Sequence, residues 1–326
     1  MKTFLHSILV ILLVAAGAAA WQPAHAQSYP TKPIRFIIPY PPGGGSDTIF
    51  RQFVPHLAER LGQPIVVDNR GGAGGSMGME AAARAKPDGY TIVAALTAQL
   101  AVNPALYKNL PYDPVKDFAP ITLFADGPYL LVVHPSLPVK SVKEFIDYVR
   151  KNPGKISYAS AGNGSGAHLA GELLNSMTGI KMVHVPYKGG GPGLIGLLSG
   201  EVQLSFQTWA SSRGHIKEGR IRALGVTTSR RPKAIPDIPT IAEAGVPGYA
   251  TGVWYALLAP AGTPRAIIDR LNRETVAVLK MPEFSKQLMV QAIDPIGSTP
   301  EELAQYIKSE MDKWAKMVKE AGIRIE

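Results

Sequence analysis

Residues 34–62 read IRFIIPYPPGGGSDTIFRQFVPHLAERLG and join a strand, a glycine-rich turn and a helix in immediate succession. The apolar run 34–38 predicts a buried strand. Between residues 47 and 61, apolar side chains recur at every fourth position, which predicts an amphipathic helix that ends at Gly62. A strand that leads directly into a helix is the repeating unit of an α/β fold.

Short apolar strands continue to alternate with helical patterns along the rest of the chain. A second α/β series begins after the apolar run 121–133, and an apolar return strand at 253–258 precedes the C-terminal helices. Two such series joined by apolar strands predict two lobes with a ligand cleft between them. We expect lobe 1 to comprise residues 27–125 and 250–326, and lobe 2 to comprise residues 126–249.

The N-terminus has the features of a secretory signal peptide. Lys2 precedes an apolar run from Ile8 to Ala20, and Ala24-His25-Ala26 follows as a small-residue cleavage motif. The apolar run is shorter than the ~20 residues that span a bilayer. We therefore expect residues 1–26 to be removed after Ala26, and the mature protein to lie outside the cytoplasm.

Composition excludes several classes of function. The chain has 326 residues, no cysteine and a net charge of +9, with 46% hydrophobic and 18% charged residues. This balance is typical of a globular protein, and the absence of cysteine excludes disulfides and thiol catalysis. The basic excess is scattered, and its densest cluster is Arg230-Arg231-Pro232-Lys233. Without an aromatic-interleaved basic stripe, it favours a small anionic ligand over nucleic acid.

Two motifs resemble those of enzymes, but the residues around them do not support an active site or a cofactor site. The histidine spacing does not support a metal site either. Gly74-Gly75-Ser76-Met77-Gly78 matches the G-x-S-x-G nucleophile elbow, but residues 70–75 separate it from the preceding strand. Residues 191–196 match G-x-G-x-x-G, yet the next strand ends in Phe206-Gln207-Thr208-Trp209 and offers no carboxylate to a ribose. No two histidines have metal-ligand spacing on a helix. We expect no catalytic residue, no cofactor and no metal.

Two loops have a clearer physical purpose. Residues 40–47 and 160–166 are glycine-rich, and each leads from a predicted strand into a predicted helix. Such a loop exposes backbone N–H groups at the positive end of the helix dipole and so favours an anion. We expect Ser46 or Asp47 to cap the first helix, and the N–H of Ser165 to be one of the donors. One loop in each lobe predicts a clamp for a carboxylate across the cleft.

The chain resembles the substrate-binding receptors of tripartite tricarboxylate transporters, the Bug family of periplasmic solute-binding proteins. The resemblance extends over essentially the whole chain after residue 26, and it depends on the order and spacing of short motifs. These motifs are Tyr29-Pro30, Pro42-Gly43-Gly44 with Asp47, Asn69-Arg70 with Gly72-Ala73-Gly74-Gly75, Pro87-Asp88-Gly89-Tyr90-Thr91, Asn103-Pro104, Ser160-Ala161-Gly162, Val185-Pro186-Tyr187-Lys188-Gly189, Pro236-Asp237-Ile238-Pro239-Thr240 and Ala259-Pro260-Ala261-Gly262-Thr263-Pro264.

The resemblance implies a two-lobed periplasmic binding protein of type II, a Venus flytrap that closes on a small organic acid. In this family the two loops hold one ligand carboxylate, largely through backbone amides and bridging waters. The positions implied for the near end of the site are Tyr40, Pro42, Gly43, Gly44, Gly45, Ser46, Asp47, Ser160, Ala161, Gly162, Gly164, Ser165, His168 and Tyr187. The far end varies among members, and its candidates are Ala98, Gln99, Asn103, Gln207, Thr208 and Trp209.

The resemblance implies a monomeric receptor that is not an enzyme. Such a receptor would capture a small organic carboxylate and deliver it to the membrane components of a tripartite tricarboxylate transporter. Di- and tricarboxylates and aromatic acids all fit the sequence, with Trp209 as either a cleft residue or a core aromatic. Many members have an acidic residue where Gln207-Thr208-Trp209 stands, so its absence disfavours an amino-acid ligand. The alternatives are a sensor that presents the acid to a membrane kinase, and an exported serine hydrolase acting through Ser76.

Overall fold

The structure, a computed structural model, describes residues 29–320, so the predicted signal peptide and its cleavage site lie outside the described residues. The described residues from Lys32 onward belong to one compact unit. Among the described residues, no helix is both long enough and apolar enough to cross a membrane.

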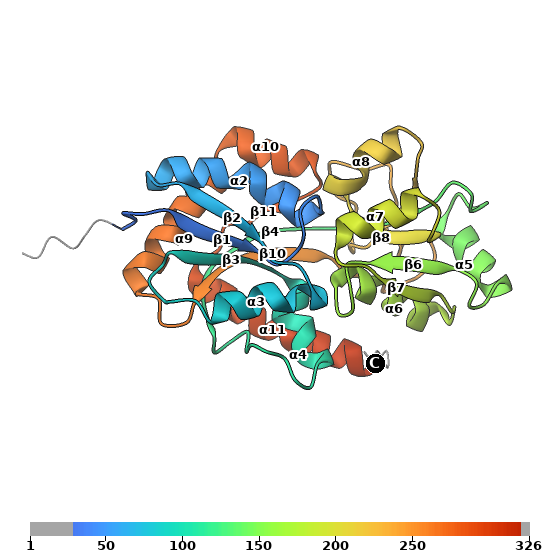
Figure 1. Ribbon diagram of the computed structural model, residues 1–326. Helices are drawn as coiled ribbons and strands as arrows, with labels where there is room; N and C mark the ends of the chain where they lie inside the picture. The colour runs from blue at the N-terminus through green and yellow to red at the C-terminus, as the bar shows by residue number, and fades with distance from the viewer. Residues whose placement is uncertain (1–28, 321–326) are drawn as a thin grey trace, which may run out of the picture. The chain divides into compact units, whose positions relative to one another are not determined.

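The first sheet has six strands in the order β11-β4-β10-β3-β1-β2. The pairs β1–β2 and β1–β3 are parallel, whereas β10 and β11 pair in antiparallel fashion. Helices cover both faces, with α2 and α10 above the sheet and α3 and α11 below it (Figure 1). The strands are β1 (Ile34–Ile38), β2 (Ile65–Asn69), β3 (Thr91–Leu96), β4 (Phe118–Gly127), β10 (Val253–Pro260) and β11 (Asp294–Pro295). The helices are α2 (Gly45–Leu61), η1 (Ala73–Gly75), α3 (Ser76–Ala83), η2 (Ala98–Val102), α4 (Asn103–Leu106), α9 (Arg265–Leu279), α10 (Pro282–Val290) and α11 (Pro300–Glu320).

The second sheet has five strands in the order β7-β6-β8-β5-β9. Its central strand β8 pairs in parallel with β6 and in antiparallel with β5. The strands are β5 (Tyr129–Val133), β6 (Ser157–Ser160), β7 (Val183–Pro186), β8 (Leu204–Thr208) and β9 (Arg222–Val226). The helices are α5 (Val142–Lys151), α6 (Gly166–Thr178), α7 (Gly190–Leu198) and α8 (Trp209–Lys217).

Each sheet has a core of its own. Beside the first sheet, aromatic rings pack edge to face, and the Phe53 and Phe124 ring centroids are 4.9 Å apart. The second core packs around Tyr158 and Phe206, which are 0% and 2% exposed. The chain passes from one sheet to the other at Pro128, between β4 and β5, and returns after β9. This confirms the expected two-series α/β architecture, while the lobe boundaries at 125/126 and 249/250 stay a prediction.

Three local predictions differ from the structure. Helix α2 begins at Gly45, because Gly44 takes the extended N-cap conformation and neither Ser46 nor Asp47 is the cap. The apolar pattern predicts a strand over residues 202–206, whereas β8 begins at Leu204 and continues to Thr208, because Gln207 and Thr208 extend the ladder with β5. The helical segments 98–106 and 282–290 were not predicted from the sequence.

Candidate functional site

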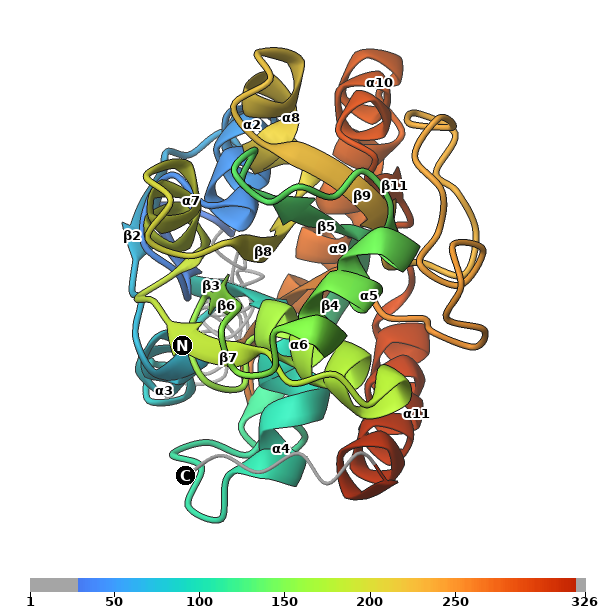
Figure 2. The ribbon, with the colours of Figure 1, turned by 90° about the vertical axis from the view of Figure 1, so that its right-hand side faces the viewer.

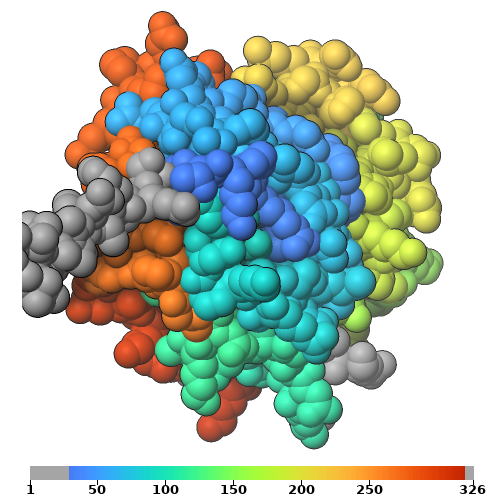
Figure 3. Space-filling model, turned by 60° about the vertical axis from the view of Figure 1, so that its left-hand side comes forward, coloured from blue at the N-terminus to red at the C-terminus, as the bar shows by residue number. Residues whose placement is uncertain are grey.

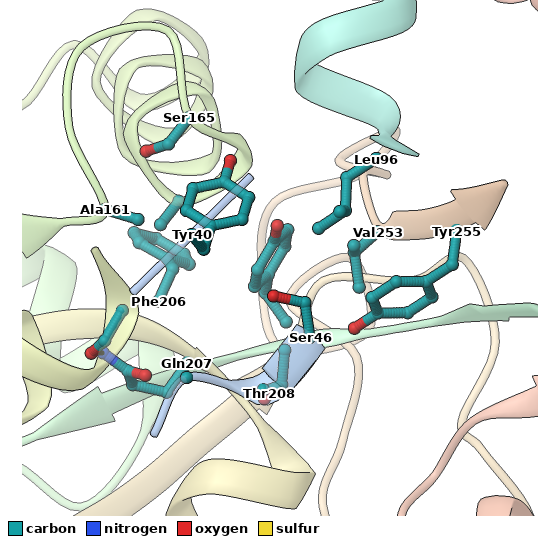
Figure 4. Close-up of a pocket in the computed structure, with 15 residues that line it drawn as sticks. Tyr40, Ser46, Leu96, Ala161, Ser165, Phe206, Gln207, Thr208, Val253 and Tyr255 are labelled. Carbon is teal, nitrogen blue, oxygen red and sulfur yellow. Dashed lines mark hydrogen bonds between the residues drawn. The ribbon is translucent and has the colours of Figure 1, made fainter. Parts of the chain in front are cut away.

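A small cavity of about 50 Å³ lies where loops and strands of both sheets meet. Its lining combines hydroxyl groups, apolar side chains and glycine backbone, and none of its residues is charged (Figure 4). The lining residues are Tyr40, Gly44, Gly45, Ser46, Leu96, Tyr129, Ala161, Ser165, Ala167, Gly190, Phe206, Gln207, Thr208, Val253 and Tyr255.

Four helices begin at this cavity. Gly45, Ala167 and Gly190 lie in the first turns of α2, α6 and α7, and Thr208 is the N-cap of α8. The first N–H groups of a helix have no partner within the helix, and the dipole places positive charge there. Since no side-chain charge faces the space, backbone groups dominate its potential and favour an anion.

The expectation for Ser165 is wrong in one respect. Its N–H already donates to the Gly162 carbonyl at 3.1 Å, and its hydroxyl accepts from the His168 N–H at 3.3 Å. Ser165 is the N-cap of α6, so the first-turn N–H groups that remain for a ligand belong to Gly166 and Ala167. The loop still supplies backbone donors, but from positions one and two residues later. Lys188, the nearest basic candidate that the resemblance implies, is exposed and does not line the cavity.

Hydroxyl groups supply further donors to the cavity. Tyr255 is fully buried, and its hydroxyl has no hydrogen-bond partner among the described residues. Burial raises the pKa of Tyr255 well above its ordinary value, so the hydroxyl keeps its proton. In Figure 4 the hydroxyls of Tyr255 and Ser46 both point toward the middle of the site. A buried O–H without a partner is costly unless a ligand accepts its hydrogen bond.

Gln99 is buried outside the cavity lining and positions Tyr40. Its side-chain amide donates to the Tyr40 hydroxyl at 2.8 Å and to the Gly74 carbonyl at 2.6 Å, and its oxygen accepts from the Leu96 N–H at 3.0 Å. Burial raises the pKa of Tyr40 to about 12, and the Tyr40 hydroxyl donates to Gly74 at 3.3 Å. Gln99 is therefore a support for the wall of the cavity and not part of its lining.

Asp47 ties the first loop to the sheet. Its buried carboxylate accepts from the Gly43 N–H at 3.0 Å, from the Arg51 guanidinium at 2.9 Å and from the Asn69 amide at 2.9 Å. Asn69 also donates to the Tyr40 carbonyl at 2.9 Å. Burial alone would raise the pKa of Asp47, but these hydrogen bonds together lower it below its ordinary value. Asp47 thus orders the loop and does not itself face the cavity.

We expect Asp47→Asn to destabilise the protein by about 1–3 kcal/mol near pH 7, because a buried carboxylate loses charge-assisted hydrogen bonds. A lowered pKa means that folding favours the ionised form, so this stability is present above the unfolded pKa of about 4 and is lost as pH falls through the folded pKa. Urea unfolding should therefore show a wild-type advantage at pH 7 that shrinks below about pH 4. The exposed Asp237→Asn is the control, and a pH-independent difference would contradict the role of the charge.

The other candidate positions lie around the cavity and not in its lining. Asn103 is fully buried, and its side-chain amide donates to the Ser76 hydroxyl at 3.3 Å. Ser76 is thus a hydrogen-bond partner of Asn103. His168 stacks on His184 with ring centroids 4.0 Å apart. Trp209 packs against a hydrophobic core cluster of the second lobe, and its indole N–H donates to the Val290 carbonyl at 3.0 Å. The remaining candidates outside the lining are Pro42, Gly43, Ala98, Ser160, Gly162, Gly164 and Tyr187.

Several lining residues were missed from the sequence: Leu96, Tyr129, Ala167, Gly190, Phe206, Val253 and Tyr255. Tyr129 and Tyr255 stand at the start of apolar strands, where the pattern predicts only burial. Polar atoms in apolar strands are the one cue that the sequence offered for them, because a buried hydroxyl needs a partner.

The two lobes touch directly beside the cavity. The Tyr107 hydroxyl, after α4, donates to the Asn163 carbonyl of the second loop at 2.9 Å. Gly45 of α2 lies so close to Thr208 that a Cβ at residue 45 would stand 3.0 Å from both the Cβ and the Cγ2 of Thr208. This is a closed arrangement, in which the small cavity has contributions from both sheets.

Comparison with known proteins gives a consistent result. The family model described as the tripartite tricarboxylate transporter family receptor matches residues 49–323. The structure of the periplasmic binding protein BugD is 35% identical, with a TM-score of 0.88 over 91% of this chain and 100% of that chain. Rpa4515 of R. palustris, solved with adipate, is 37% identical, with a TM-score of 0.88 over 91% of this chain and 99% of that chain.

MatC from Rhodopseudomonas palustris, with bound malate, is 32% identical, with a TM-score of 0.85 over 89% of this chain and 100% of that chain. These matches cover both sheets, so they confirm the expected fold of a two-lobed periplasmic binding protein.

Proposed function

The chain belongs to the tripartite tricarboxylate transporter receptor family, and from this premise we propose that it is a periplasmic receptor for a short aliphatic dicarboxylate, which it delivers to the membrane components of such a transporter. The family is one of substrate-binding receptors, so the expectation that the chain is not an enzyme is confirmed. The hydrolase alternative is thereby overturned, in keeping with Ser76 serving as a partner of Asn103.

The observation that carries the proposal is an uncharged cavity at the start of four helices. One carboxylate would take the N–H groups at the first turns of α2 and α6, where dipoles and free donors converge. The buried Tyr255 hydroxyl would donate to a second acceptor on the ligand. Two groups of acceptors joined by a short apolar segment match a dicarboxylate, because Leu96, Phe206 and Val253 supply apolar walls.

The size of the cavity argues for a short ligand. One water needs roughly 10–15 Å³ on this measure, so about 50 Å³ holds only a few such groups. Adipate and malate, found in two related structures, are acids of this kind. Trp209, the side chain that would favour an aromatic acid, lies outside the lining. The absence of an acidic lining residue disfavours an amino acid, whose ammonium group would need one.

A binding screen tests this assignment. We expect four- to six-carbon dicarboxylates such as malate, succinate and adipate to bind more tightly than citrate, benzoate or glutamate in isothermal titration calorimetry. The tightest ligand should also raise the free energy of unfolding by ~2.7 kcal/mol at a hundredfold excess over its Kd. If citrate or benzoate bound tenfold more tightly than every short dicarboxylate, the assignment of the substrate class would be wrong.

A further inference from the structure

A basic groove runs between α8 and α10, and the ligand site does not use it. It consists of two hollows of about 570 and 440 Å³ that share Arg213, Lys286 and Val290. Helix α8 follows strand β8 of the second sheet, whereas α10 packs beside the first sheet. Both helices lie along the same edge of the unit in Figures 1 and 2. Figure 3 shows the blue region of α2 between the orange and the gold segments on this side. The groove therefore spans both lobes.

The chemistry of the groove is basic and apolar. Its cations are Arg213, Lys217, Lys233 and Lys286, and none of them forms an ion pair within the described residues. Glu283 is the one carboxylate in its lining. Met289 and Val290 are 45% and 50% exposed and lie beside these cations. Clustered unpaired cations around exposed apolar side chains match an acidic partner that also has apolar side chains.

Consecutive residues of the chain connect the groove to the ligand site. Gln207 and Thr208 line the cavity, and Trp209, the next residue, begins α8 and lines the groove. The Trp209 indole donates to the Val290 carbonyl at the end of α10, which joins the two lobes across the groove. A relative movement of the lobes would separate α8 from α10 and divide the groove. Its complete form therefore depends on the closed arrangement.

We propose that this groove is the docking surface for an acidic, partly apolar periplasmic segment of the transporter's membrane component, and that it is complete only in the acid-bound receptor. The proposal rests on the proposed function and adds the surface and the chemistry of its partner. A protein segment fits better than an anionic lipid surface, because the site is concave and its two hollows can accept side chains. Lys233 lines the groove, so the proposal gives a role to one residue of the basic cluster at residues 230–233.

The test measures binding of the purified receptor, with and without its dicarboxylate, to phosphatidylcholine vesicles that contain the membrane components. We expect the acid to strengthen binding, and Lys217→Glu/Lys286→Glu to weaken it at least about tenfold while calorimetry shows unchanged affinity for the acid. Lys151→Glu/Lys308→Glu is the matched control, because it makes the same charge change at exposed positions on α5 and α11. The wild-type interaction should also weaken as salt increases.

Four results would overturn the docking surface: no binding of the wild type to these vesicles, normal binding by the groove variant, an equal loss in the control variant, or equal binding to phosphatidylglycerol vesicles without the membrane components. The last result would assign the groove to lipid. The last three results leave the proposed function intact, whereas no binding of the wild type would also count against delivery to the transporter. Capture of the acid fails separately, if calorimetry detects no binding of any organic acid. Circular dichroism of each variant confirms that a loss of binding does not reflect unfolding.

Discussion

Gly45→Ala is expected to reduce ligand affinity by about fivefold to about 150-fold without destabilising the protein. The new Cβ would stand 3.0 Å from both the Cβ and the Cγ2 of Thr208 and closer still to its hydroxyl, so no rotation of that side chain relieves the contact. Overpacking of this kind costs about 1–3 kcal/mol, and only the closed form experiences it. Residue 45 is helical, so alanine is tolerated locally and lowers the entropy of the unfolded chain.

Two further variants make this result specific. Gly214→Ala adds the same methyl group to α8, where a Cβ meets nothing within 4 Å, and it should leave affinity unchanged. Thr208→Ala removes both γ atoms, so Gly45→Ala should lose less affinity in that background than in the wild type. Calorimetry measures affinity, and urea unfolding measures stability. If Gly45→Ala bound the acid normally, closure of the lobes at this contact would not be part of binding.

Tyr255→Phe is expected to reduce affinity by about tenfold to a hundredfold, because a hydrogen bond to a charged acceptor contributes roughly 1.5–3 kcal/mol. Its effect on the ligand-free protein should be zero or slightly stabilising. The hydroxyl has no partner among the described residues, so the substitution removes a buried polar group without breaking a bond. A loss of affinity without a loss of stability distinguishes a ligand donor from a structural residue.

Tyr249→Phe provides the opposite case. Tyr249 is 1% exposed, and its hydroxyl donates to the Ala170 carbonyl at 2.8 Å in the core of the second lobe. Its loss should lower the free energy of unfolding by about 1 kcal/mol or more and leave affinity unchanged. Should Tyr255→Phe bind the acid as tightly as the wild type, the Tyr255 hydroxyl would not be a ligand donor.

Much of the first loop followed from local patterns in the sequence. The strand 34–38, the glycine turn and the helix that ends at Leu61 are set by side chains near one another in the chain, and the structure has all three. Glycine between a strand and a helix predicts exposed N–H groups wherever it occurs, because the reason is the local backbone. Family motifs extended this interpretation to the second loop at residues 160–166.

Which N–H groups remain available could not be predicted in the same way. The Ser165 N–H is occupied by Gly162 because of the detailed shape of the turn, so the donors move to Gly166 and Ala167. Trp209 shows the same limit, because a large aromatic at the end of a strand can face a cavity or leave it. It lies outside the cavity, where it packs against a core cluster and donates to the Val290 carbonyl, 81 positions away in sequence.

The sequence by itself determined the α/β class, the two glycine-rich loops and the preference for an anion, because these depend on periodicity, turn chemistry and helix dipoles within short segments. Only the tertiary structure decided the far wall of the cavity and the groove beside it. Tyr255 and Ser46 line one cavity, and α8 meets α10, across long separations in the chain. Such neighbours are chosen by strand register and packing between sheets, where the free energy depends on surfaces that no local pattern describes.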